Sequence, residues 1–301
     1  MTDPIQNACP QPPFPPAVAP GQQNWKLTLS YDGTDYKGWQ VQPGARTIQG
    51  EVQAALGRIL GEAPLPQGSG RTDAGVHALA QVASFPLTTR IPAANLHRAL
   101  NGTLPAAIRL TETKLVRHSF HARHSAQAKT YEYRIFRAAL CPPFLARYVY
   151  ASRWPMDFDA LQQAAQAFVG QHDFLSFAAS DPDLGTRENP GLQIHDGKQK
   201  GTIKTIFSSA WSQMETADGP LLVYRVRGSG FLHHMVRNLV GTMLEVGRGK
   251  FKVGDIARIL AARDRSAAGP TAPARGLFLH SVEYRPADEA LDALDAFDTM
   301  S

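Results

Sequence analysis

The first half of the chain alternates segments with strand and helix periodicities. Residues 25–31 alternate apolar and polar side chains, which predicts a strand because successive strand residues point to opposite faces. Apolar residues recur at helical spacing from 48 to 60, and Thr47 before them is a suitable N-cap, so a helix is predicted there. The same patterns predict strands near 64–69, at 77–85 and at 107–116, and a helix at 92–100. The order is β-α-β-β-α-β.

The second half repeats this order with one added helix. Predicted strands lie at 129–136, 202–215, 220–227 and 276–284, and predicted helices at 157–169, 231–246 and 254–262. Asp218-Gly219 between the two middle strands is a strong hairpin signal. We therefore expect an α+β protein of two tandem ferredoxin-like halves, with mainly antiparallel sheet and a central basic cleft. RNA-binding domains of the RRM type share this topology, although topology alone does not settle function.

Breaks in the pattern predict the domain boundaries. Residues 1–24 are rich in proline and nearly uncharged, which predicts a disordered tail. We expect an N-terminal α/β domain at 25–120 and a C-terminal α/β domain at 121–286. The latter contains an aperiodic inserted loop at about 178–201, and 287–301 form an acidic tail.

Composition narrows the class of protein. The chain has 301 residues with 43% hydrophobic and 19% charged side chains, which are globular values. No apolar run approaches the ~20 residues of a membrane helix, and the N-terminus is no signal peptide. The cysteines Cys9 and Cys141 form no disulfide framework, so a cytoplasmic protein without membrane contact is expected.

Charge is unevenly distributed around the modest net value of +5. Lysine and arginine dominate between 109 and 137 and between 223 and 252, whereas the last residues are acidic. This asymmetry favours a polyanionic partner such as nucleic acid. Ordinary solvated surface charge explains it equally well.

The most distinctive segment is GSGRTDAGVHA at 68–78. Its glycines allow a sharp turn and a close approach to a ligand, and Arg71 stands two residues before Asp73. It lacks the Gly-Lys-Ser/Thr ending of a phosphate-binding loop, and a strand follows where a dinucleotide-binding fingerprint needs a helix. A lone Asp in such a turn usually caps a backbone N–H. The nearby cation favours a charged carboxylate, which suits a nucleophile.

Other constellations are more ambiguous. His118, His121 and His124 are spaced by three, but no carboxylate or cysteine completes a zinc set, so no metal site is expected. Tyr131 and Tyr133 share one face of a strand and are either core aromatics or base-stacking residues. The histidines of the 231–246 helix pack or cap, whereas Arg237 is suited to reach a carboxylate or phosphate.

Four motifs together resemble the tRNA pseudouridine synthase A family, in the expected order. They are YDGTDYKGWQ at 31–40, GRTDAGVH at 70–77, FHAR at 120–123 with KTYEY at 129–133, and FLHHMVRN at 231–238. The resemblance runs from about Trp25 to Tyr284. The longer proline-rich tail and the expanded 178–201 loop depart from the family.

The resemblance implies isomerisation of uridine to pseudouridine at nucleotides 38, 39 and 40 of the tRNA anticodon stem-loop. It implies Asp73 as the nucleophile, Tyr131 in contact with the target base and Arg237 as the partner of the catalytic carboxylate. A homodimer without cofactor or metal is also implied. Arg71 is a further expected substrate contact, and Arg123, Lys129 and His234 are candidates for the RNA backbone.

Two rival functions remain compatible with the residues. A non-catalytic RNA-binding module gains nothing from a carboxylate near phosphates, so Asp73 discriminates against it. A nucleoside or glycoside hydrolase with an aspartate nucleophile predicts free uracil and usually a second carboxylate, for which no partner is evident.

Overall fold

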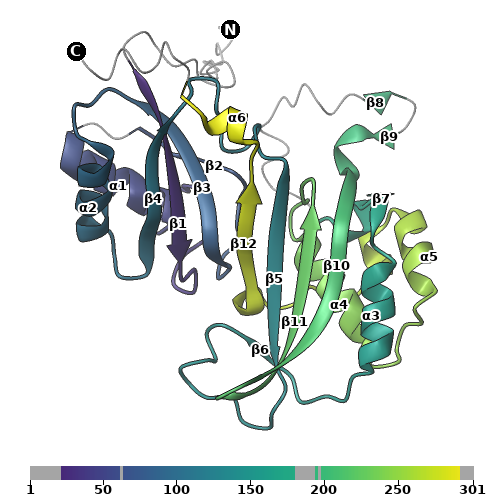
Figure 1. The fold of residues 1–301 in the computed structure, drawn as a ribbon. Helices are drawn as coiled ribbons and strands as arrows, with labels where there is room; N and C mark the ends of the chain where they lie inside the picture. Colours follow the sequence, from purple (N-terminus) through teal and green to yellow (C-terminus); the bar gives the residue numbers. More distant parts are fainter. Residues whose placement is uncertain (1–21, 62–63, 180–193, 196–197, 292–301) are drawn as a thin grey trace, which may run out of the picture.

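The computed structural model describes residues 22–61, 64–179, 194–195 and 198–291. Its strands form a ten-stranded, mostly antiparallel sheet that is continuous from one side of the molecule to the other (Figure 1). The order along the sheet is β4 (Ile108–Val116), β1 (Gln23–Tyr31), β3 (His77–Leu87), β12 (Leu277–Glu283), β5 (Ala128–Phe136), β11 (Gly219–Gly228), β10 (Ile203–Thr216) and β7 (Gly170–Asp173). Short strands β2 (Gln67–Gly68) and β6 (Tyr150–Ala151) pair with β3 and β5, and β8 (Ile194–His195) pairs with β9 (Lys198–Gln199). The predicted α+β class is confirmed.

Helices accompany both ends of this sheet. Figure 1 shows α1 (Ile48–Leu60) and α2 (Ala93–Thr103) beside β4 and β1, and α3 (Phe158–Gln166), α4 (Met235–Gly247) and α5 (Asp255–Ala262) beside β10 and β7. The predicted cap of the first helix is confirmed, because Thr47 accepts a hydrogen bond from the Gly50 N–H. Asp157 caps α3 in the same way through the Ala160 N–H. Such caps satisfy backbone donors that the first helical turn leaves without partners.

One continuous hydrophobic core joins the two halves. Its members come from strands and helices on both sides of β12, and they include Trp25, Phe85, Tyr133, Leu239 and Leu279. The opposite face of the sheet carries a smaller cluster, where Phe120 and Ala122 cover Val82 and Val116. Residues after β4 therefore fold back over the first half rather than linking the halves directly.

The halves meet at β12. This strand pairs in parallel with β3 over Phe278↔His77 and Leu279↔Ala78, and antiparallel with β5 along most of its length. Because β3 begins immediately after the 70–76 loop, the pairing brings this loop beside elements of the second half. The loop with Asp73 thus lies at the seam between the halves.

The predicted helix at 231–246 begins later than expected. His234 adopts a left-handed backbone conformation with φ 59°, and α4 starts at Met235. Apolar spacing alone cannot detect such a break, because Phe231 and Leu232 also pack against the core. His233 and His234 consequently lie in a turn before the helix and not within it.

Most of the predicted tail at 1–24, the inserted loop at 178–201 and the acidic tail at 287–301 lie outside the described residues. Part of the acidic tail is described, and it is docked. Helix α6 (Pro286–Glu289) places Glu289 2.5 Å from Lys26 and 2.6 Å from Lys114. Lys26 and Lys114 project from β1 and β4, so these lysines have an acidic partner within the chain.

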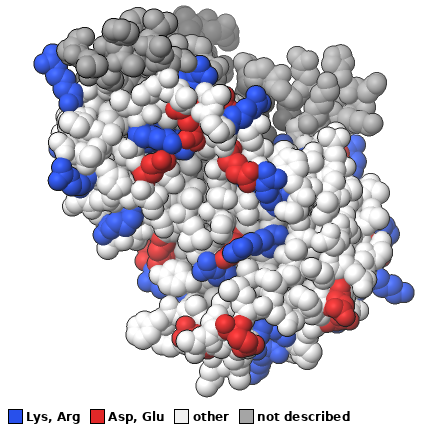
Figure 2. All heavy atoms as spheres, viewed as in Figure 1, with Lys and Arg blue, Asp and Glu red and all other residues white. Residues whose placement is uncertain are grey.

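Charges of both signs mix on the face that Figure 2 shows. The strand register explains part of this mixing, because it sets Glu132 on β5 opposite Arg225 on β11. Glu132 is buried and accepts from both Arg225 and Arg134, at 2.6 and 2.7 Å. Counting basic residues along the sequence missed this cross-strand pairing. Among the described residues, no helix is long and apolar enough to cross a membrane.

Candidate active site

The 70–76 loop is fixed from its own strand. Gln81 on β3 accepts from the Ser69 hydroxyl at 2.7 Å and donates to the Gly70 carbonyl at 2.9 Å. Within the loop, the Val76 N–H donates to the Asp73 carbonyl at 3.1 Å. Asp73 therefore uses its backbone carbonyl for the turn, which leaves its carboxylate to point away from the loop.

The YDGTDYKGWQ segment braces the same loop from outside. A Cβ atom on Gly33 would lie 2.0 Å from the Val76 carbonyl oxygen, and one on Gly38 would lie 2.4 Å from the Thr72 carbonyl oxygen. Contacts this close are possible only for glycine. Tyr31 adds a hydrogen bond of 2.8 Å between its hydroxyl and that of Thr72. The segment is thus a scaffold that holds the Asp73 loop in place.

Arg237 forms an ion pair with Asp73 across the seam. Its Nη1 lies 2.9 Å from Asp73 Oδ2, and its Nε donates to the Ala272 carbonyl at 2.8 Å. The two side chains are only 15% and 16% exposed, so water screens the pair less than it screens a surface ion pair. The backbone contact orients the guanidinium, which in turn fixes one oxygen of the carboxylate.

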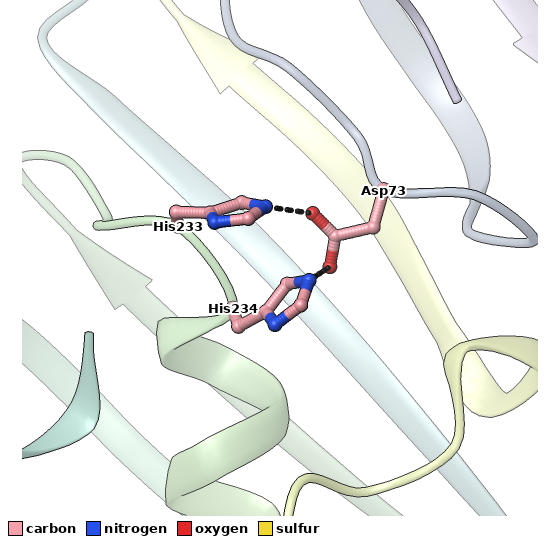
Figure 3. Close-up of side chains that lie close together, drawn as sticks. All are labelled: Asp73, His233 and His234. Carbon is pink, nitrogen blue, oxygen red and sulfur yellow. Dashed lines mark ion pairs between the residues drawn. The ribbon is translucent and has the colours of Figure 1, made fainter. Parts of the chain in front are cut away.

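Two consecutive imidazole rings also face this carboxylate (Figure 3). Nε2 of His233 lies 3.6 Å from Asp73 Oδ1, and Nε2 of His234 lies 3.4 Å from Oδ2. The left-handed conformation of His234 allows adjacent side chains to converge on one point. Burial lowers the pKa of His234 below its usual 6.5, and the nearby Asp73 charge opposes this shift.

Tyr131 is buried beside the site. Its ring meets that of Phe231 edge-on, with ring centroids 5.0 Å apart. Burial raises the pKa of its hydroxyl above the usual 10.0, and the neighbouring Tyr31 and Asp73 raise it further. Tyr131 therefore presents a neutral phenol to the site at physiological pH.

Lys129 connects β5 to the Asp73 loop. Its ammonium donates to the Ser69 carbonyl and would lie 3.0 Å from a Cβ atom on Gly70. Burial and, to a lesser extent, the nearby cations Arg123 and Lys204 together lower the pKa of Lys129 to about 8. Of the other predicted contacts, Arg71 is half-buried and Arg123 is exposed.

The His118, His121 and His124 spacing has a structural explanation. Nδ1 of His121 accepts from the backbone N–H groups of Arg123 and His124, at 3.0 and 3.3 Å. Burial lowers the pKa of His121 to about 4, so its ring stays neutral. His121 thus closes a turn in the segment that covers the second face of the sheet.

Comparison with known proteins identifies the family. The family model described as tRNA pseudouridine synthase matches residues 28–125 and 164–285. The chain belongs to the tRNA pseudouridine synthase family. A protein of Solibacter usitatus named tRNA pseudouridine synthase A is 49% identical over 259 residues, 86% of this chain and 98% of that protein. A Moorella thermoacetica protein of the same name is 44% identical, over 86% of this chain and 98% of its own length. The predicted isomerase family is confirmed.

Three of the four motifs that resemble the tRNA pseudouridine synthase family meet around Asp73. One carries Asp73, another braces its loop, and FLHHMVRN supplies both imidazoles and Arg237. KTYEY adds Lys129 and Tyr131 at the edge of the same site. The FHAR motif instead lies on the other face, where the Ala122 N–H donates to Ser84 at 3.0 Å.

Sequence reasoning singled out Asp73 and Arg237 but missed three residues that shape the site. His233 was grouped with packing residues, although its ring faces Asp73 Oδ1. Gln81 lies in an alternating strand pattern, which shows no sign that its amide fixes a loop. Tyr31 closes the first strand, and only its place in the YDGTDYKGWQ motif signalled a role beyond the core.

Proposed function

We propose that this protein converts uridine to pseudouridine at nucleotides 38, 39 and 40 of the tRNA anticodon stem-loop, with Asp73 as the nucleophile. The observation that carries the proposal is the enclosed Asp73–Arg237 ion pair, at 2.9 Å, in a chain of the tRNA pseudouridine synthase family. A turn-capping aspartate has no need of a cation from a distant helix. The names of the relatives supply tRNA as the substrate class.

The reaction rearranges one bond and loses no atom. The bond between C1′ and N1 breaks, the uracil turns, and C1′ bonds to C5. The C5 proton leaves and N1 gains one, so the product is an isomer. A transient covalent bond to the Asp73 carboxylate divides this into two easier steps. Arg237 holds Oδ2 and leaves Oδ1 to react.

Uridine in a stem must leave the base stack before it reaches Asp73. Flipping costs a few kcal/mol, which contacts in the site must offset. Tyr131 supports this role through its neutral phenol and its place beside the Asp73 charge. Arg71 is proposed to contact the phosphate or the vacated space, since it precedes Asp73 in the same loop. Lys129, Arg123 and His234 are proposed contacts of the RNA backbone.

The proposal also includes the arrangement of the two halves and the path of the RNA between them. The strand orders β4-β1-β3-β2 and β12-β5-β11-β10 support two ferredoxin-like halves, at 25–120 and 121–286, joined through β12. RNA would cross the seam in a basic cleft. Burial lowers the pKa of both Lys129 and Lys204, and the nearby Arg123 charge lowers both further, which supports such a cleft. We further propose a homodimer that works in the cytoplasm.

Unmodified tRNA incubated with the purified protein tests the proposal. Pseudouridine mapped by chemical labelling and primer extension should appear at nucleotides 38 to 40. Asp73→Asn should lower turnover by about a thousandfold or more while tRNA binding persists. Asp218→Asn is the matched control, because Asn-Gly supports the exposed hairpin turn as well as Asp-Gly does.

Three outcomes of this assay would contradict the proposed function, each in a different way. Free uracil with an abasic product would indicate a hydrolase instead. Unchanged turnover in Asp73→Asn would remove Asp73 from the nucleophile role. Tight tRNA binding with no pseudouridine in the anticodon arm would leave only an RNA-binding module.

A further inference from the structure

Asp73, His233 and His234 together form a set of metal-ligand type. Among the described residues, one oxygen of Asp73 and one ring nitrogen of each histidine all lie within 4.8 Å of one another. The three side chains are 16%, 32% and 29% exposed, so a solvated ion can reach them. Figure 3 shows that both rings present Nε2 to the carboxylate.

We propose that these three residues bind one divalent transition-metal ion, Zn²⁺ or Co²⁺, and that the bound ion inhibits the protein. Binding itself follows from the geometry alone. Inhibition rests on the proposed function, because an ion on Asp73 occupies the oxygen that would attack the substrate.

The three ligand atoms lie close to the spacing that a tetrahedral ion requires. Zn–N and Zn–O bonds of about 2.0–2.1 Å place neighbouring ligand atoms about 3.3–3.4 Å apart. His233 Nε2 lies 3.6 Å from Oδ1 and His234 Nε2 lies 3.4 Å from Oδ2, and one oxygen and both nitrogens lie within 4.8 Å of one another. A small rotation of the carboxylate and the rings would bring the three ligand atoms onto one ion. Two imidazoles and one carboxylate also leave a fourth position open to water or to a substrate oxygen.

The backbone of His234 prepares it for this role. Its left-handed conformation, with φ 59°, turns two successive rings to the same side.

Two features limit the affinity. Arg237 lies 2.9 Å from Asp73 Oδ2, and its positive charge repels an incoming cation. His233 Nδ1 is buried and has no hydrogen-bond partner among the described residues. Ligand histidines usually donate through their second nitrogen, and loss of that contact typically weakens metal binding 10- to 100-fold, roughly. We therefore expect reversible binding, with a dissociation constant on the order of micromolar and not that of a resident cofactor.

Cobalt titration of the metal-stripped, full-length protein tests binding without RNA. Visible absorption of tetrahedral Co²⁺ should saturate at one ion per chain, and Zn²⁺ should displace it. His233→Ala and His234→Asn should each weaken Co²⁺ binding at least about tenfold. Asparagine is chosen because it tolerates a left-handed backbone, which keeps the turn intact while the ligand is lost.

Two further variants sharpen the test. His124→Ala removes a histidine outside this set and should leave Co²⁺ affinity unchanged. Arg237→Gln removes the opposing charge and should tighten Co²⁺ binding about tenfold. Circular dichroism melting of every variant separates ligand loss from unfolding, and a folded His234→Asn variant with wild-type Co²⁺ affinity overturns the site.

Activity assays separate this inference from the proposed function. Zn²⁺ should inhibit pseudouridine formation with the dissociation constant measured by displacement. If Co²⁺ binds as described but no pseudouridine forms, the metal site stands and the proposed function fails. If pseudouridine forms and saturating Zn²⁺ leaves its rate unchanged, the inhibitory role is wrong.

Discussion

Asp73 has its charge partner far away in the chain and its backbone partners close by. Arg237 lies 164 residues further on, whereas Val76 and Gln81 fix the loop locally. The local contacts set where the carboxylate stands, and the distant ones set its charge environment. Loop position and electrostatics can therefore be changed separately by mutation.

Arg237→Lys should lower kcat about a hundredfold with tRNA affinity within about twofold. A lysine ammonium cannot hold the Ala272 carbonyl and Asp73 Oδ2 together, as the guanidinium does. Removing one oriented charge contact at a reacting group typically costs about 2.7–4 kcal/mol. Single-turnover kinetics and filter binding measure the two quantities. An unchanged kcat would show that Arg237 does not need to hold the Asp73 carboxylate in place.

Lys129 should make stability depend on pH in the alkaline range. Its folded-state pKa is about 8, against a usual 10.5, so between these values the unfolded chain holds a proton that the folded chain lacks. Unfolding then takes up a proton, and the free energy of unfolding rises with pH. Urea titrations at several pH values should show this rise in the wild type, and Lys129→Met should lose it. If the free energy of unfolding depends on pH in the same way in both proteins, Lys129 is not the group with the lowered pKa.

At the scale of elements, periodicity located helices α1 to α5 and all the longer strands, but it missed the short elements β6, β7, β8, β9 and α6. It also failed where the backbone conformation of a single residue sets the start of a helix. The start of α4 was misplaced because φ at His234 depends on tertiary contacts and not on hydrophobic spacing. The Asp73–Arg237 partnership came from family resemblance, since no local pattern links residues this far apart. The two imidazoles on Asp73 were missed for the same reason.

Gly33→Ala should destabilise the protein and reduce activity together. Its new Cβ would stand 2.0 Å from the Val76 carbonyl oxygen, so the brace or the Asp73 loop must move. We expect a loss of about 2–4 kcal/mol in the free energy of unfolding, by analogy with overpacked cores. Thermal melting and pseudouridine assays measure both effects.

Gly102→Ala is the matched control for that variant. Gly102 lies within α2, and a Cβ there meets nothing within 4 Å. Alanine in a helix gains about 0.5–1 kcal/mol over glycine, so this variant should be slightly stabilised with normal activity. Equal losses in the two variants would show that the brace has no special role.

At the scale of the whole molecule, one sheet and one core run through both halves. The β3–β12 pairing is short, but the core packs continuously beneath it. The halves should therefore unfold together. Two-state unfolding of this kind predicts coincident transitions from probes placed in different regions.

Single-tryptophan reporters test this cooperativity. Trp39 is buried in the first half and Trp211 in the second, so Trp→Phe replacements that leave one or the other give separate fluorescence signals. Their urea midpoints should agree within error. Two midpoints would show that the halves are independent folding units.

The seam between the two halves also determines when the Asp73 site forms during translation. A ribosome translating this chain completes the Asp73 loop early, but the cation and imidazoles that face it emerge more than half a chain later. The β12 strand that brings these parts together comes later still. A nascent chain therefore carries the Asp73 carboxylate without the cation and imidazoles that face it, and the site is complete only when β12, the last strand of the sheet, is inserted.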